Sequence, residues 1–70
     1  MARVRCFAGV SYPERPVAFE WKGAWLDVTR VIAQAHTPEG MVFDVLAQDG
    51  RRYRLMWLEA SDNWSVKTQL

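Results

Sequence analysis

Apolar and polar residues alternate along most of the chain, which is the two-residue period of a β-strand. β-branched and aromatic residues are common among them, and no convincing helical period appears. The pattern predicts five or six short strands, the first around residues 3–10. Residues 11–16 contain two prolines three positions apart. We expect them to break the sheet, because proline cannot donate to a paired ladder.

The first hairpin is predicted to turn at Lys22-Gly23, where glycine accepts a positive φ. This turn leaves Trp25 on the polar face. After residue 28 the alternation slips by one position, so we expect a β-bulge near Thr29-Arg30, followed by a loop over residues 36–40. The register pairs apolar with apolar residues on the inner face: Phe19 with Leu26, and Val17 with Val28.

The second hairpin is decided by which turn keeps its apolar face continuous. A two-residue turn at Asp49-Gly50 would put arginines among apolar residues, so the pattern favours a three-residue loop, Gln48-Asp49-Gly50, with a left-handed glycine. On the other face this loop sets Asp44 opposite Arg54. Residues 61–63 then turn the chain into a last strand at 64–67. The predicted inner pairs are Val45 with Tyr53, Phe43 with Leu55, and Met41 with Trp57.

Strands this short and closely linked indicate one all-β domain over residues 1–70, a small antiparallel meander of five or six strands curled into an SH3-like open barrel. Half of the residues are hydrophobic, and four Trp, three Phe and two Tyr supply a core for so short a chain. No apolar run approaches the length that spans a bilayer, and we expect a cytoplasmic protein.

Metal, cofactor and disulfide are not expected. Cys6 is the single cysteine, which suits a reducing compartment, and with His36 it makes up all the strong nitrogen and sulfur ligands. We expect Cys6 to be a small buried hydrophobe and His36 a solvated loop residue. The predicted register forces no two carboxylates together, and no glycine-rich phosphate loop is present. The sequence therefore predicts a protein that is not an enzyme.

Two stretches, residues 14–23 and residues 49–55 followed by Trp64, resemble a family of small uncharacterised bacterial proteins. Residues 14–23 fit the family's opening, E-R-P-V-x-F-x-W-x-G, and residues 49–55 fit its hairpin, D-G-x-x-Y-x-L, which a tryptophan closes, here Trp64. The resemblance covers residues 14–66 and brings no established activity with it. The second hairpin with Trp64 is also faintly similar to the C-terminal module of bacterial polymerase accessory proteins in error-prone DNA synthesis, which would imply a link to DNA repair or replication.

The favoured function is a non-catalytic module that binds a protein partner or a second copy of itself. The register sets Val42 opposite Met56 on the outer face, with Leu58 beside them, and apolar residues on both faces of a strand are either covered or adhesive. The first strand or another chain could cover them; both remain open. Trp25 is a further candidate, and Ile32 and Leu46 extend the apolar set.

The alternative is an auxiliary nucleic-acid-binding module that uses Arg51, Arg52, Arg54 and Trp25. The net charge of +1 argues neither way. Asp44 is expected to neutralise Arg54, and an ordinary salt-bridged surface is the favoured explanation of the cluster. Other basic residues share strand parity or lie nearby: Arg3, Arg5, Arg15, Lys22 and Lys67.

Overall fold

The structure is a computed structural model that describes residues 2–8 and 13–69. These residues form six antiparallel strands, each paired with its neighbours in chain order. The expected all-β meander, curled into an open barrel, is confirmed. The strands are β1 (Val4–Ala8), β2 (Pro13–Trp21), β3 (Ala24–His36), β4 (Gly40–Ala47), β5 (Arg52–Leu58) and β6 (Asn63–Gln69).

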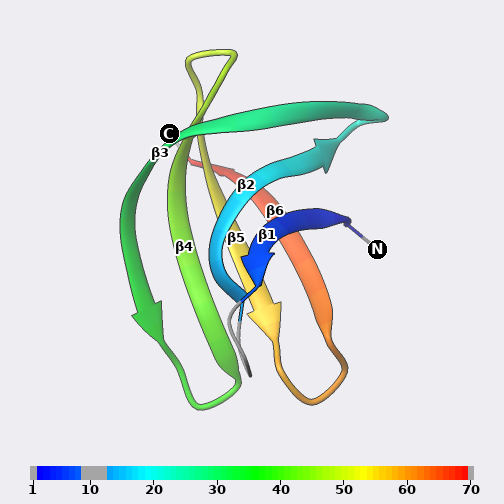
Figure 1. The fold of residues 1–70 in the computed structure, drawn as a ribbon, viewed down its shortest axis with the longest axis vertical. Coiled ribbons are helices and arrows are strands. Elements are labelled where there is room, and N and C mark those ends of the chain that lie inside the picture. The colour runs from blue at the N-terminus through cyan, green and yellow to red at the C-terminus, as the bar shows by residue number, and fades with distance from the viewer. Residues whose placement is uncertain (1, 9–12, 70) are drawn as a thin grey trace.

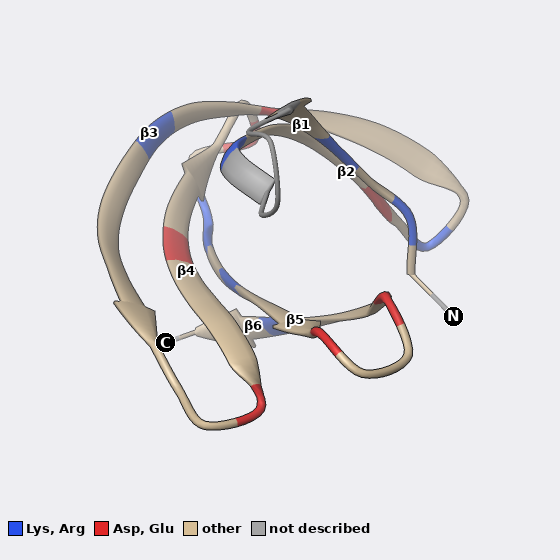
Figure 2. Cartoon of the chain, turned by 60° about the horizontal axis from the view of Figure 1, so that its bottom comes forward, with Lys and Arg blue, Asp and Glu red and all other residues tan. Residues whose placement is uncertain are grey.

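The sheet curls into a half-barrel (Figure 1). Figure 2, turned from that view, shows the strands curving around one common side of the sheet. A single antiparallel bridge between Ala2 and Trp64 connects the chain before β1 to β6. The two ends of the strand order are therefore brought together by one bridge. The described residues contain no helix long and apolar enough to cross a membrane.

The first hairpin has the predicted two-residue turn. Lys22 and Gly23 have φ angles of 50° and 83°, and Phe19 lies opposite Leu26. Positive φ at both central residues gives a turn whose twist matches that of the flanking strands. The predicted pairing of Val17 with Val28 is wrong, because β2 and β3 separate beyond the pair of Ala18 with Asp27.

The separation has its cause in β3, which bends toward β4. Val28 pairs with Ala47 of β4, and the register shifts before Arg30, so Thr29 is the extra residue of the predicted bulge. The Thr29 hydroxyl donates a hydrogen bond of 3.0 Å to the carbonyl oxygen of Leu46. A second register shift lies between residues 31 and 33. One strand thus contributes to two differently oriented parts of the sheet.

The prediction that the prolines break the sheet is wrong. β2 begins at Pro13, opposite Ala8, and the fully buried Pro16 lies opposite Cys6. Residues 13–17 pair with β1 alone among the described strands, and the β1–β2 register shifts twice. Proline fits such an irregular ladder because this part of β2 has a partner strand on one side only. The missing N–H therefore does not cost a hydrogen bond to a second strand. β1 itself ends at Ala8; the predicted residues 9 and 10 lie outside the described residues.

The second hairpin is confirmed in full. Gly50 has a φ of 80°, and its N–H donates to the carbonyl oxygen of Ala47. The observed pairs include Val45 with Tyr53, Phe43 with Leu55, Met41 with Trp57, and Asp44 with Arg54.

The remaining connections are shifted by a few residues from the prediction. His36 and Gly40 belong to strands, so the loop is reduced to residues 37–39. The last turn spans residues 59–62, and β6 begins at Asn63. Asp62 has a φ of 49° and accepts a hydrogen bond of 2.8 Å from the indole N–H of Trp57.

The core fills the inside of the curl with residues that alternate along β4 and β5. Tyr53 lies at its centre, with its ring 4.8 Å from that of Phe19 and 5.4 Å from that of Trp21. The predicted core positions of Tyr53 and Trp57 are confirmed. The buried cluster comprises Phe19, Met41, Phe43, Val45, Ala47, Tyr53, Leu55 and Trp57.

Candidate binding surfaces

The outer face of β3, β4 and β5 carries a short apolar row. Val42 lies opposite Met56, as the register predicted, and opposite Ala35 on its other side. Leu58, two residues beyond Met56, is 41% exposed. β1 packs against β2, and no described strand covers the row. Among the described residues, the first strand therefore does not cover this face.

Ile32 lies next to this row on β3, at the second register shift. It is 42% exposed, as much as Leu58. Leu46 is half-buried and lies between Arg30 and Arg52, so charged neighbours separate it from the row.

The free edge of β3 is a feature that the hydrophobic pattern did not single out. Residues 31–36 pair with β4, and no other described strand pairs with them. Figure 1 shows this part of β3 at the outer margin of the sheet, where β2 has already curved away. The residues are Val31, Ile32, Ala33, Gln34, Ala35 and His36, none of them an acid, lysine or arginine.

A cleft opens where β2 and β3 diverge, with a volume of ≈ 200 Å³. Val17 and Val28, the pair that does not form, face it from the two strands, and Arg15 and Arg30 lie at its borders. Val31, the first residue of the β3 edge, also lines the cleft.

The three arginines that follow the turn of the second hairpin do not form one positively charged cluster. Arg54 donates through Nε to Asp44 Oδ1 at 2.8 Å, and this hydrogen bond raises the pKa of the guanidinium. Arg52 shares that outer face, next to Leu46 and opposite Gln69. Arg51 lies in the hairpin connection, where its backbone N–H donates to Asp49. One of the three charges is therefore neutralised.

Trp25 belongs to a different cluster. Its ring lies 5.7 Å from the guanidinium carbon of Arg3 and 5.2 Å from that of Arg5. The structure shows no contact between Trp25 and the arginines at 51, 52 and 54 among the described residues. The predicted set is thus divided between two surfaces. Figure 2 shows basic positions both on β1–β2 and around β5.

Phe7 is the binding candidate that the sequence analysis missed. Its side chain is 56% exposed, and the guanidinium carbon of Arg15 lies 5.0 Å from its ring. The signal was present in the alternation of Arg3, Arg5 and Phe7, which puts all three on one side of β1. Without the position of β1 in the sheet, nothing indicated that this side faces solvent.

The side chains that could support catalysis or metal binding are part of strands or of hydrogen bonds to core residues. Cys6 is half-buried, and burial raises the pKa of its thiol to about 11. His36 ends β3 opposite Met41 instead of lying in a loop. Asp49 and Asp62 accept hydrogen bonds from Tyr53 and Trp57. The described part of the chain contains no cluster of three or more His, Cys, Asp or Glu residues suited to a metal ion.

Comparison with protein-family models, with curated proteins and with solved structures found no match for this chain. The resemblance of residues 14–23 and 49–55 to the small bacterial proteins stays a prediction.

Proposed function

We propose that this protein is a non-catalytic binding module that pairs the free edge of β3 with a strand of another protein, and that this protein is a second copy of the chain. The observation that carries the proposal is the strand at residues 31–36, which is paired on one side among the described strands and carries no Asp, Glu, Lys or Arg. Its outward N–H and C=O groups are a template for a further strand.

Edge strands in natural proteins usually carry lysines, inward charges, prolines or β-bulges that discourage pairing. The β3 edge has one such feature, the register shift near Ile32. Arg30 precedes it, and the next Lys, Arg, Asp or Glu along the chain is Glu39, with His36 as the one other titratable side chain in between. The edge is therefore poorly protected, and the apolar row of Ala35, Val42 and Met56 lies directly beside it.

A second copy suits this edge because antiparallel pairing of a strand with itself is self-complementary across a two-fold axis. Such pairing sets residue i of one copy opposite residue j of the other and j opposite i, so charges of one sign on a short strand come close together across the axis and repel. The absence of acids, lysines and arginines from residues 31–36 removes that repulsion. The neighbouring row would add apolar area to the backbone hydrogen bonds.

The test is the solution mass over a range of protein concentrations, at about 50 mM and about 500 mM salt. We expect a dimer that persists at high salt, because backbone pairing and apolar contact are weakly screened. Ile32→Lys should raise the dissociation constant at least about tenfold, a cost of about 1.4 kcal/mol. Ile32 is 42% exposed, so the substitution should leave the monomer folded.

Two controls locate the interface. Ala60→Lys adds the same charge in the exposed turn between β5 and β6 and should leave the mass unchanged. Leu58→Lys changes an apolar side chain as exposed as Ile32, but one that lies on β5 and not on the β3 edge. A larger effect at Leu58 than at Ile32 would contradict edge pairing, and a monomer at every concentration would contradict self-association.

A further inference from the structure

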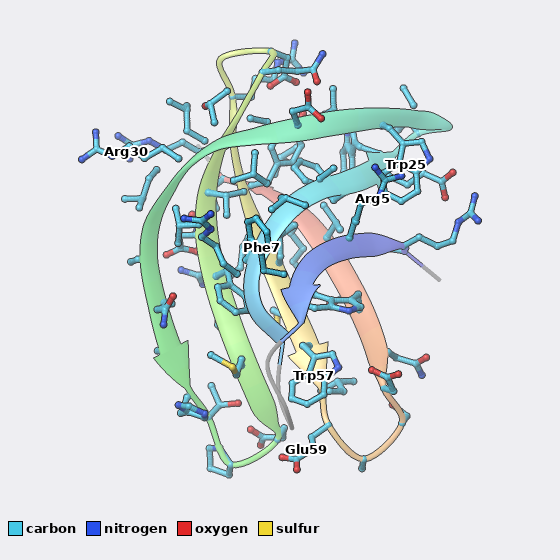
Figure 3. All side chains as sticks on the ribbon, viewed as in Figure 1. Arg5, Phe7, Trp25, Arg30, Trp57 and Glu59 are labelled. Atoms are coloured by element: carbon cyan, nitrogen blue, oxygen red, sulfur yellow. The ribbon has the colours of Figure 1, made fainter. Side chains whose placement is uncertain are left out.

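The outside of β1, β2 and the start of β3 forms a surface that we call the arginine–aromatic face. Arg3, Arg5 and Phe7 alternate along the first strand and its approach. Phe7 lies opposite Arg15 of β2, and Trp25 follows in β3, one strand further. Figure 3 shows Arg5, Phe7 and Trp25 on this side of the molecule. The face consists of Arg3, Arg5, Phe7, Arg15 and Trp25.

Each aromatic ring on this face has a guanidinium group against it. Arg3 and Arg5 approach Trp25 at 5.7 and 5.2 Å, and Arg15 approaches Phe7 at 5.0 Å. All three distances are within the range of a cation–π interaction. Both rings nevertheless remain accessible, Trp25 at 40% and Phe7 at 56% exposure. Large exposed aromatics held in this way offer flat apolar surface next to positive charge.

The charges of the face are only partly neutralised. Arg3 forms an ion pair of 3.2 Å with Glu20, which lies next to Trp25. Arg5 and Arg15 form no ion pair with any residue that the structure describes. Two guanidinium groups are therefore available to an anion, and a third could be released from Glu20.

We propose that the arginine–aromatic face binds a single strand of nucleic acid. Proteins that bind single strands combine a positive surface for the backbone with aromatic side chains on which bases stack. Here the guanidinium groups of Arg5 and Arg15 contact phosphates, and bases stack on Trp25 and Phe7. In the free protein the same guanidinium groups pack on the rings, and they move to the phosphates when a base takes their place.

The two rings favour a single strand over the other polyanions that arginines attract. A duplex keeps its bases stacked inside and presents phosphates, so exposed rings add little to its binding. An acidic peptide would use the arginines but gains little from ring stacking. The face is also separate from the free edge of β3, so its function does not depend on the proposed self-association.

The experiment measures fluorescence anisotropy of labelled oligothymidylate and oligouridylate of about 12 nucleotides, within the range of sites on small barrels. We expect binding to both at about 50 mM salt that weakens steeply as salt is raised. A hairpin duplex and polyglutamate serve as competitors. Competition by either one as strong as by unlabelled oligothymidylate would overturn the proposal, and so would the absence of binding at low salt.

Variants assign the binding to this face. Trp25→Ala should weaken binding about 5- to 150-fold, the value of one stacked base. Arg5→Ala should lower the slope of log affinity against log salt by about 0.7, the value of one phosphate contact. Arg52→Ala, which removes an exposed arginine on β5, is the matched control and should change little. An equal loss at Arg52 would overturn the assignment to this face.

One variant should bind more tightly, which a folding defect cannot imitate. Glu20→Gln removes the carboxylate that holds Arg3, so Arg3 becomes available to a phosphate. We expect higher affinity and a steeper salt dependence for this variant. Unchanged or weaker binding by Glu20→Gln, together with unchanged binding by Trp25→Ala, would reject the face as the site. Ile32→Lys, the self-association variant, should not change the affinity of the monomer.

Discussion

The hydroxyl of Tyr53 donates a hydrogen bond of 2.6 Å to Asp49 Oδ2 and so connects the centre of the core to the tip of the second hairpin. The other carboxylate oxygen accepts the backbone N–H of Arg51 at 3.0 Å. These two hydrogen bonds, that of Tyr53 first, lower the pKa of Asp49. Burial and the same hydrogen bond raise the pKa of Tyr53. One aspartate thus holds the loop on which the register of β4 and β5 depends.

Tyr53→Phe should destabilise the protein at neutral pH and lose part of that effect in acid. Because the folded-state pKa of Asp49 is lower than 3.8, its ionised form stabilises the fold above that pH, and this stability is lost as the pH falls through the folded-state value. The Tyr53→Phe variant lacks the hydrogen bond that is the main cause of the lowered Asp49 pKa. We therefore expect the urea midpoints of the wild-type protein and the variant to differ more at about pH 7 than at about pH 3. A difference that grows on acidification would contradict this account.

Gly40 and Gly50 are required for different reasons, and substitutions should separate them. A Cβ on Gly40 would collide with the carbonyl of Trp57 in the neighbouring strand, so Gly40→Ala should cost about 2 kcal/mol or more. A Cβ on Gly50 meets nothing within 4 Å, but its φ of 80° disfavours alanine by about 1 kcal/mol. Thermal unfolding measures both costs. Asparagine should be tolerated at 50 and not at 40; equal tolerance at both positions would be evidence against this distinction.

Asp62 combines a left-handed backbone with the hydrogen bond to the Trp57 indole. Asp62→Asn keeps an acceptor oxygen and suits a positive φ, so we expect little change in stability. Asp62→Ala loses both features and should cost about 1–2 kcal/mol in denaturant unfolding. Asp62→Gly restores the backbone freedom alone and should fall between them. If the alanine and asparagine variants are equally stable, the hydrogen bond contributes nothing measurable.

The second hairpin could be predicted to the residue because its information is local. Alternation in β4 and β5 allows one register in which Phe43 meets Leu55, and a glycine stands where that register needs a left-handed residue. A shift by one position would have put Arg52 and Arg54 inside. Pattern and turn chemistry therefore agree on one answer.

The errors lie where a distant part of the chain decides the outcome. Whether Pro16 can enter a strand depends on which of its neighbours pairs with it, and β2 is one-sided there because β3 bends away. The same bend separates Val17 from Val28 and leaves the edge of residues 31–36 open. The sequence indicated the bulge but not the direction of the bend.

The candidate surfaces were predictable to different degrees for the same reason. The pair of Val42 with Met56 followed from the hairpin register. The partners of Trp25 depend on where β1 joins the sheet, and alternation within β1 could show that Arg3, Arg5 and Phe7 share a side but not which strand lies beside them. Trp25 was therefore assigned to the arginines at 51, 52 and 54, and the structure places it with Arg3 and Arg5 instead.

The thiol of Cys6 should react slowly in the folded protein. Burial raises its pKa to about 11 from an ordinary value of 9.0, which lowers the thiolate fraction at neutral pH about a hundredfold. The thiolate is the reactive form, so modification by a disulfide reagent at about pH 8 should be slower than in urea by about this factor.

Because the folded-state pKa of Cys6 is raised, the stability linked to this group is fully present below pH 9.0 and is lost as the pH rises through about 11. Cys6→Ala should remove that alkaline loss and leave the neutral-to-acid profile unchanged. A native thiol that reacts as fast as the unfolded one would show that the site opens readily, and the raised pKa would then not protect it.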